Sequence, residues 1–138
     1  MGLGDQRPGD KDPLALAAGE RVRLVVHAVA EADPALAGDY FYRKSLVGLD
    51  ALEGKVEATV RGVRELERES RDDLAIRMGD LSEYCSMYAM VGQAAEAVSC
   101  LRTALTEPSM TEPFLEPWLP LYDPVRASPE FQALLAEL

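Results

Sequence analysis

The stretch from Asp80 to Pro108 constrains the fold most, because two apolar stripes of helical spacing flank a single glycine. Apolar residues recur at three- and four-residue steps on both sides of Gly92, which is the pattern of two amphipathic helices. Glycine adopts a left-handed turn without steric cost, so Gly92 predicts where the chain folds back. The stripes are Leu81, Tyr84, Cys85, Tyr88 and Val91, then Ala94, Ala97, Val98, Leu101, Ala104 and Leu105.

The ends of this hairpin also carry signals. Asp80 and Glu83 have the spacing of a capping box, so we expect the first helix to begin at Asp80. Pro108 is expected to end the second helix. Ala97 and Ala104 lie on one helical row, and their small side chains allow a neighbouring backbone to approach closely.

These residues resemble a tetratricopeptide repeat over residues 80–108. Leu81 and Tyr84 replace the Trp and Leu of the family pattern, and Pro108 comes one residue early. The resemblance implies a right-handed superhelix of antiparallel helical hairpins that binds a partner protein or peptide. The matching positions are Cys85, Tyr88, Gly92, Ala97, Leu101, Ala104 and Pro108.

The rest of the chain favours an all-α fold of about seven helices, because no alternating strand pattern is visible. Two Asp-Pro pairs predict helix starts. We therefore expect helices over 12–31 and 33–49. Asp50 and Glu53 predict a capping box for a third helix. We expect the segment from Leu74 to Gly79 to be helical, and Ser128-Pro129 to open a last helix.

Residues 34–70 also have the outline of a helical hairpin, with a turn expected near Gly48. The small-aromatic-small pattern of the repeat is missing from Ala51 to Glu67, so this is a degenerate repeat or an unrelated helical pair. A helix break near Ser70 and a helix that continues toward Gly79 are both compatible with the charged sequence between them.

Residues 113–138 contain five prolines and many large apolar residues. The last part resembles the tails that close many bacterial tetratricopeptide arrays, which often end larger regulators. We expect this tail to cover the second helix of the 80–108 hairpin and residues 12–138 to form one domain, after a disordered tail at 1–11. The residues expected to be buried are Phe114, Trp118, Leu119, Tyr122, Phe131, Leu134 and Leu135.

The formal net charge is −10, which argues against binding of nucleic acid or anionic lipid, since both require clustered cations. A more specific interpretation of the negative charge is that the protein binds a basic protein partner. No apolar run reaches the ~20 residues of a membrane span, and the first residues lack the apolar core of a signal peptide. We therefore expect no membrane association.

The residues that carry chemistry are sparse. Cys85 and Cys100 are expected to be buried free thiols in a reducing, cytoplasmic compartment, and His27 has no ligand partner for a metal. Glu112 and Glu116 beside Phe114 and Trp118 leave acid–base catalysis as a rival hypothesis. No phosphate loop, dinucleotide fingerprint or metal spacing is present, so we expect no cofactor and no enzymatic activity.

The sequence thus predicts a protein–protein interaction module or scaffold. By the resemblance, the partner lies along the first helix of the repeat, and an aromatic cluster at 39–45 adds a candidate ridge. The alternatives are a homodimerising structural protein and the C-terminal regulatory domain of a larger bacterial regulator. The candidate partner-binding residues are Ser82, Glu83, Ser86, Ala89, Met90, Tyr40 and Arg43.

Overall fold

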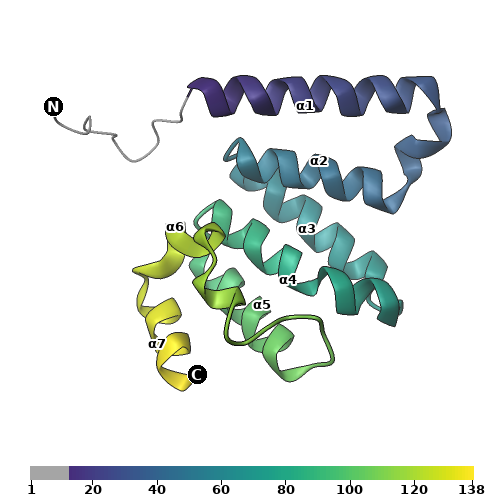
Figure 1. The fold of residues 1–138 in the computed structure, drawn as a ribbon. Helices are drawn as coiled ribbons and strands as arrows, with labels where there is room; N and C mark the ends of the chain where they lie inside the picture. Colours follow the sequence, from purple (N-terminus) through teal and green to yellow (C-terminus); the bar gives the residue numbers. More distant parts are fainter. Residues whose placement is uncertain (1–12) are drawn as a thin grey trace, which may run out of the picture.

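The computed structural model describes the chain from residue 13 to residue 138, and its side chains from residue 20 onward. This part of the chain contains seven α-helices, three short 3₁₀ segments and no strand, which confirms the predicted all-α fold (Figure 1). The expected tail at 1–11 and the Asp12 cap lie outside the described residues. The elements are α1 (Pro13–Ala32), η1 (Pro34–Gly38), α2 (Tyr40–Leu52), α3 (Val56–Ser70), α4 (Leu74–Met90), α5 (Ala94–Thr106), η2 (Glu116–Trp118), η3 (Pro120–Tyr122), α6 (Asp123–Arg126) and α7 (Pro129–Glu137).

Two helical hairpins, α2–α3 and α4–α5, form the middle of the molecule, and each turns on a glycine with positive φ. Gly92 has a φ of 76°, as the sequence predicted. Gly54, with a φ of 70°, turns the first hairpin. The turn expected near Gly48 is therefore wrong, because Gly48 lies inside α2. Both glycines allow the left-handed conformation that other residues adopt only with strain.

The helix starts correct several sequence predictions. Asp39 caps α2 by accepting a hydrogen bond from the Tyr42 amide, and Asp73 caps α4 by accepting one from the Ile76 amide. Asp50 and Asp80 instead lie inside α2 and α4. The capping-box spacing misled because an acidic pair at that spacing also fits a helix interior, where the carboxylates reach other helices.

The boundary near Ser70 is resolved by the structure. The helix that begins at Val56 ends at Ser70, and α4 begins at Leu74, so the segment to Gly79 is helical as expected. The Asp33-Pro34 start opens only the short η1 segment, and α2 begins later than predicted.

The two hairpins share one packing pattern. Thr59 follows Gly54 by the same number of residues as Ala97 follows Gly92. Both Thr59 and Ala97 are fully buried. Val63 and Leu101 are likewise equivalent and fully buried. A small residue followed by a branched apolar residue therefore recurs in α3 and α5, although the small-aromatic-small pattern of the repeat is missing from Ala51 to Glu67.

The α4–α5 contact contains a disulfide between Cys85 and Cys100, whose Cα atoms are 5.2 Å apart. The prediction of two free thiols is therefore wrong. The close approach that Ala97 and Ala104 permit brings the two cysteines within bonding distance, since a disulfide requires a Cα separation below about 7 Å. The expectation of a reducing compartment rested on free thiols, so the disulfide removes its support.

The C-terminal segment covers the α4–α5 hairpin, with η3 and α6 against α4 and α7 against α5. Tyr122 and Phe131 are fully buried, and Leu134 is nearly so. The expected burial of Phe114 and Trp118 is wrong, because they are 91% and 55% exposed. The loop before α6 is instead held through its backbone, as the guanidinium of Arg126 donates to the carbonyls of Pro117 and Leu119.

At the other end, α1 lies along α2 (Figure 1). Its extent agrees with the predicted 12–31 helix, but Val22, Val25 and Val29 of its apolar stripe remain about half exposed or more. Arg23 attaches α1 through ion pairs with Asp50 and Glu53, at 2.9 and 3.0 Å. Ion pairs therefore form much of the contact between α1 and α2.

Candidate partner-binding surface

The α1–α4 groove brings together three of the seven predicted site residues. Glu83, Ser86 and Met90 lie on α4 and face side chains from α1, α2 and η3 across a pocket of about 440 Å³. Its lining is dominated by apolar groups. The full lining is Val22, Val26, Ser45, Gly48, Leu49, Leu52, Glu83, Ser86, Met87, Met90 and Leu121.

The polar groups of this groove are already engaged. The Ser86 hydroxyl donates to the Glu83 carbonyl at 2.8 Å, within its own helix. The Glu83 carboxylate forms an ion pair with Lys44 at 3.1 Å and remains half exposed at the rim. Met87 and Met90 add unbranched side chains that adapt to varied shapes. The groove thus offers an adaptable apolar floor with one acidic group at its edge.

Two predicted residues of α4 do not take part in the groove. Ala89 is fully buried, so no partner reaches it in this structure. Ser82 is half-buried, and its carbonyl accepts a long hydrogen bond of 3.5 Å from the Tyr122 hydroxyl. Ser82 therefore faces the C-terminal segment, and Ala89 is enclosed because α4 packs against neighbours on several sides.

Tyr40 belongs to a largely buried polar network instead of a binding ridge. Its hydroxyl donates to Asp80 at 3.0 Å and contacts the hydroxyl of Tyr84, which in turn lies 3.0 Å from the Ser70 hydroxyl. Lys44 completes the network through its ion pair with Asp80 at 3.0 Å. Burial and the hydrogen bonds to Tyr84 and Asp80 raise the pKa of Tyr40. These contacts join α2, α3 and α4, so the network is structural.

The charges around this network keep Lys44 protonated. Burial alone lowers the pKa of Lys44, but its hydrogen bonds to Asp80 and Glu83 outweigh burial and raise the pKa overall. Arg43, the last predicted residue, forms an ion pair with Glu69 at 2.6 Å and ties α2 to α3. The aromatic cluster therefore contributes to helix packing and ion pairing.

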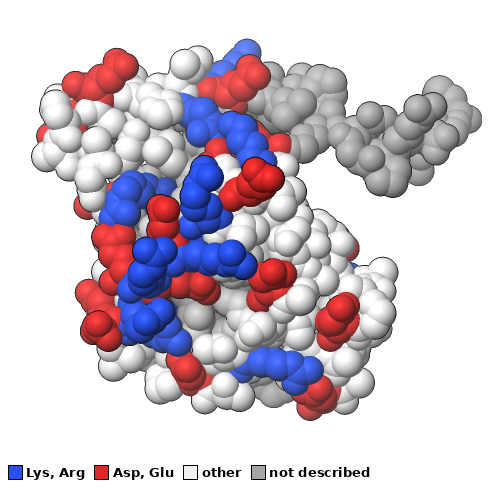
Figure 2. Space-filling model, turned by 180° about the vertical axis from the view of Figure 1, so that it is seen from behind, with Lys and Arg blue, Asp and Glu red and all other residues white. Residues whose placement is uncertain are grey.

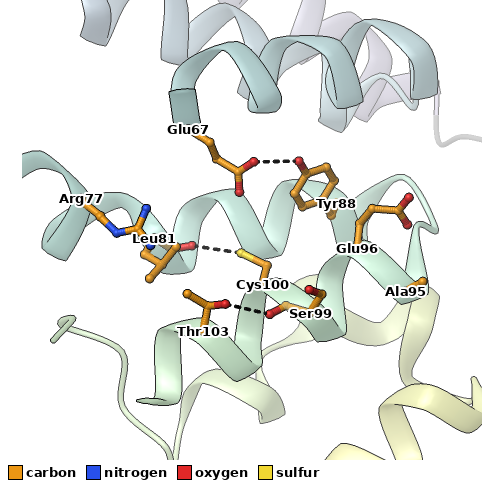
Figure 3. A pocket seen from close by; sticks show the side chains of 9 residues that line it. All are labelled: Glu67, Arg77, Leu81, Tyr88, Ala95, Glu96, Ser99, Cys100 and Thr103. Carbon is orange, nitrogen blue, oxygen red and sulfur yellow. Dashed lines mark hydrogen bonds between the residues drawn. The ribbon is translucent and has the colours of Figure 1, made fainter. Parts of the chain in front are cut away.

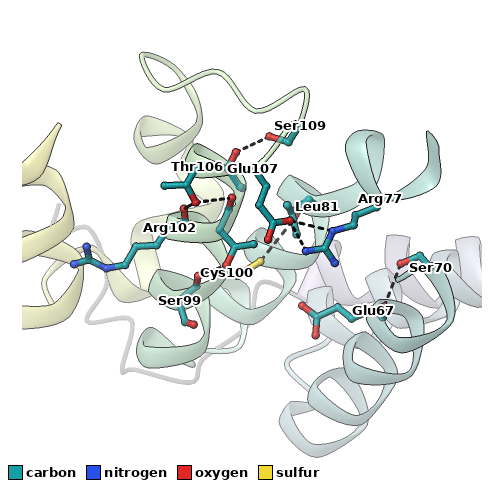
Figure 4. Close-up of polar contacts among 12 residues, drawn as sticks. Glu67, Ser70, Arg77, Leu81, Ser99, Cys100, Arg102, Thr106, Glu107 and Ser109 are labelled. Atoms are coloured by element: carbon teal, nitrogen blue, oxygen red, sulfur yellow. Dashed lines mark hydrogen bonds and ion pairs between the residues drawn. The ribbon is translucent and has the colours of Figure 1, made fainter. Parts of the chain in front are cut away.

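A second hollow, here the Glu67 pocket, lies between α3, α4 and α5 and has a volume of about 450 Å³ (Figure 3). The Tyr88 hydroxyl donates to the Glu67 carboxylate at 3.1 Å, and burial raises the pKa of Glu67. Arg77 also lines the pocket, but it is neutralised by Glu107 at 2.6 Å (Figure 4). The lining is Glu67, Arg77, Leu81, Tyr88, Ala95, Glu96, Ser99, Cys100 and Thr103.

The Glu67 pocket provides no recognisable catalytic set. Ser99 and Thr103 contribute hydroxyls, and the Thr103 hydroxyl donates to the Ser99 carbonyl. A nucleophile needs an adjacent base that a third group orients, and His27, the one histidine, contacts Tyr42 on α2 instead.

The two carboxylates of the rival hypothesis have different surroundings in the structure. Glu116 accepts a hydrogen bond from the buried Tyr122 hydroxyl at 2.9 Å, and burial raises the pKa of Glu116. Glu112 is exposed, as are the neighbouring Phe114 and Trp118. Within the described residues, no group of three or more His, Cys, Asp or Glu side chains is placed to hold a metal ion.

The other groove residues could not be recognised as a site from the sequence. Val22 and Val26 lie on the apolar stripe of α1, and Leu121 comes from the proline-rich segment, but only the fold places them opposite α4. Their distance along the chain explains why spacing alone did not identify them.

Across residues 13–138, no helix has the length and apolar character that a bilayer span requires. A scan against protein-family models, a search of curated proteins and a search of solved structures each found no match for this chain.

Proposed function

We propose that this chain is a protein–protein interaction module that binds a partner segment in the α1–α4 groove and has no catalytic activity of its own. The observation that carries the proposal is the convergence of apolar side chains from α1, α2, α4 and η3 on one groove. Helix-in-groove recognition uses such a surface, with apolar anchors spaced along one face of the partner. We further propose that the two hairpins stack as in a tetratricopeptide array.

The chemistry of the groove suggests its occupant. The apolar floor suits a short segment with apolar anchors. Glu83 at the rim pairs with Lys44 but remains half exposed, so a basic residue of the segment can share its carboxylate. The net charge of −10 favours encounter with such a basic segment. We therefore propose an apolar segment with basic neighbours as the partner.

The second candidate function is self-association through α1. Four large apolar side chains of α1 are about half exposed or more. They are Val22, Leu24, Val25 and Val29. A cluster of exposed apolar side chains is typical of an interaction surface. Light scattering of wild type and Leu24→Asp tests this candidate: a dimer that dissociates in the variant supports it, and a monomeric wild type contradicts it.

The cytoplasmic location expected from free thiols has lost that support. A buried disulfide is typical of oxidising compartments, although exceptions are known. The proposed binding function depends on the groove and not on the compartment.

Affinity capture from the source cell tests the groove with two matched variants. Leu52 lines the groove and is 63% exposed, whereas Leu74 is 62% exposed on α4 and is not among the groove residues. Neither substitution by Asp disturbs the core, which thermal melting checks. We expect Leu52→Asp to lose proteins that wild type and Leu74→Asp both retain. Equal capture by all three proteins would contradict the proposal.

A further inference from the structure

The arginines of α3 differ from most other cations of the molecule. Arg61, Arg64 and Arg68 form no ion pair within 4.0 Å among the described residues. Most other described cations are paired, so this cluster is unusual. The paired cations are Arg23, Arg43, Lys44, Lys55, Arg77, Arg102 and Arg126.

These three arginines line one hollow, here the α3 groove, of about 430 Å³. Their spacing places them along one face of α3. On the face of the molecule drawn in Figure 2, Lys and Arg side chains gather with Asp and Glu side chains among them. Val56 and Val60 supply an apolar floor. The full lining is Val56, Glu57, Val60, Arg61, Arg64, Glu65, Arg68 and Gln93.

Neighbouring carboxylates neutralise this face only in part, because several are engaged elsewhere. Glu69 pairs with Arg43 on α2. Glu67 accepts a hydrogen bond from Tyr88, although its charge also interacts with Arg64. Glu57 and Glu65 line the same groove without an ion pair within 4.0 Å. The groove therefore presents three guanidinium groups against two carboxylates, in a protein whose net charge is strongly negative.

We propose that the α3 groove is a second binding surface, separate from the α1–α4 groove, that receives an acidic segment of a protein. Guanidinium groups bind carboxylates through paired hydrogen bonds, and the exposed arginines present several such forks. Val56 and Val60 offer contacts for apolar residues between the carboxylates of that segment. The Gln93 amide, which also lines the groove, donates a long hydrogen bond of 3.5 Å to the Val91 carbonyl.

The same observations favour a polypeptide over nucleic acid. A phosphate backbone requires an extended track of cations, whereas this groove holds three arginines with Glu57 and Glu65 between and beside them. The apolar floor has no role in contacting phosphates but suits side chains of a peptide. At physiological salt the screening length is about 8 Å, so the local cations outweigh the distant negative charge.

Fluorescence anisotropy with a short labelled peptide of Glu and Leu residues tests the proposal on the full chain. We expect saturable binding that weakens as salt rises from about 50 to about 200 mM. Arg64→Glu should weaken it about tenfold or more through loss of charge-assisted hydrogen bonds. Arg21→Glu is the matched control, because Arg21 is exposed on α1, forms no ion pair among the described residues and gives the same charge change.

Several results would overturn the proposal. These are absence of binding, equal binding of a Lys and Leu peptide, and equal weakening by Arg21→Glu and Arg64→Glu. Tighter binding of a single-stranded oligonucleotide than of the acidic peptide would assign the groove to nucleic acid instead. Because the Leu52→Asp test probes a different groove, either surface can fail without the other.

Discussion

The two ends of the molecule are attached to the central hairpins in different ways. The N-terminal helix α1 exposes much of its apolar stripe and is joined to α2 by the ion pairs of Arg23. The C-terminal segment buries Tyr122 and Phe131 completely, and their rings lie 5.8 Å apart. Both ends showed apolar periodicity in the sequence, yet only one became core.

The difference shows what an apolar stripe does and does not specify. The stripe identifies the face of a helix whose burial is favourable. Which element packs on that face depends on the tertiary fold. At the C-terminus, η3, α6 and α7 wrap the α4–α5 hairpin. At the N-terminus, Val22 and Val26 form one wall of the α1–α4 groove and remain available to a partner.

The largest expected effect contrasts two phenylalanines of the C-terminal segment. Phe131→Ala should destabilise by about 3–5 kcal/mol, because it opens a cavity in the core. Phe114→Ala should change stability by less than about 0.5 kcal/mol, because that ring is exposed. Urea unfolding measures both. Similar losses from the two variants would show that the loop around Phe114 is packed.

The next effect concerns the disulfide of the α4–α5 hairpin. Replacing Cys85 and Cys100 by Ala should cost about 3 kcal/mol, because the bond closes a loop whose cysteines are 15 residues apart. Wild type should lose a similar amount in reductant, whereas the double variant should not respond to it. Two freely titrating thiols in the unreduced protein would contradict the disulfide.

A smaller effect is expected at the contact between α4 and α5. Ala97→Leu should destabilise by about 1–3 kcal/mol through overpacking, since Ala97 is fully buried. Ala95→Leu serves as the control, because Ala95 is exposed on the same helix. Equal melting temperatures for the two variants would mean that α5 presents a different face to α4.

The smallest stability effect belongs to the N-terminal end. Arg23→Ala should cost about 0.2–1 kcal/mol, as expected for a partly exposed ion pair, and the cost should shrink at high salt. The measurement is urea unfolding at two salt concentrations. A loss as large as that of Phe131→Ala would contradict the contrast between the two ends.

Lowering the pH should change the stability contributions of Glu53, near the N-terminal end, and Glu116, near the C-terminal end, in opposite directions. Hydrogen bonds from Lys55 and Arg23 lower the pKa of Glu53, so its stabilisation is present above the unfolded pKa of about 4.3 and is lost as pH falls through the folded value. Burial raises the pKa of Glu116, so ionisation of this carboxyl group destabilises the folded state. This destabilisation is absent in acid and grows as pH rises through the pKa of the folded state.

Glu53→Gln and Glu116→Gln separate these effects in unfolding experiments at pH about 3 and about 7. We expect Glu53→Gln to destabilise more at neutral pH than in acid, and Glu116→Gln to be relatively more favourable at neutral pH. The reverse ranking would contradict the burial and pairing of the two carboxyl groups.

The fold class and the Gly92 hairpin were predictable because local periodicity and a turn residue determine them. The Gly54 turn was missed because Asp50 and Glu53 imitate a helix start, although they pair with Arg23 across α1 and α2. The disulfide was missed because buried cysteines at these positions also fit free thiols. Of the residues predicted on one face of α4, Glu83, Ser86 and Met90 line the groove, whereas Ser82 and Ala89 do not. The residues opposite them across the groove depend on tertiary contacts.

Hydrogen–deuterium exchange of the intact protein tests most directly whether the two ends are held differently. Amides of α5 and α7 should exchange only through global unfolding, because buried side chains hold them. Amides of α1 should exchange much faster by local opening, and Arg23→Ala should accelerate α1 alone. Protection of α1 equal to that of α5 would contradict the account, because a firmly buried α1 is not an adjustable wall of a binding groove.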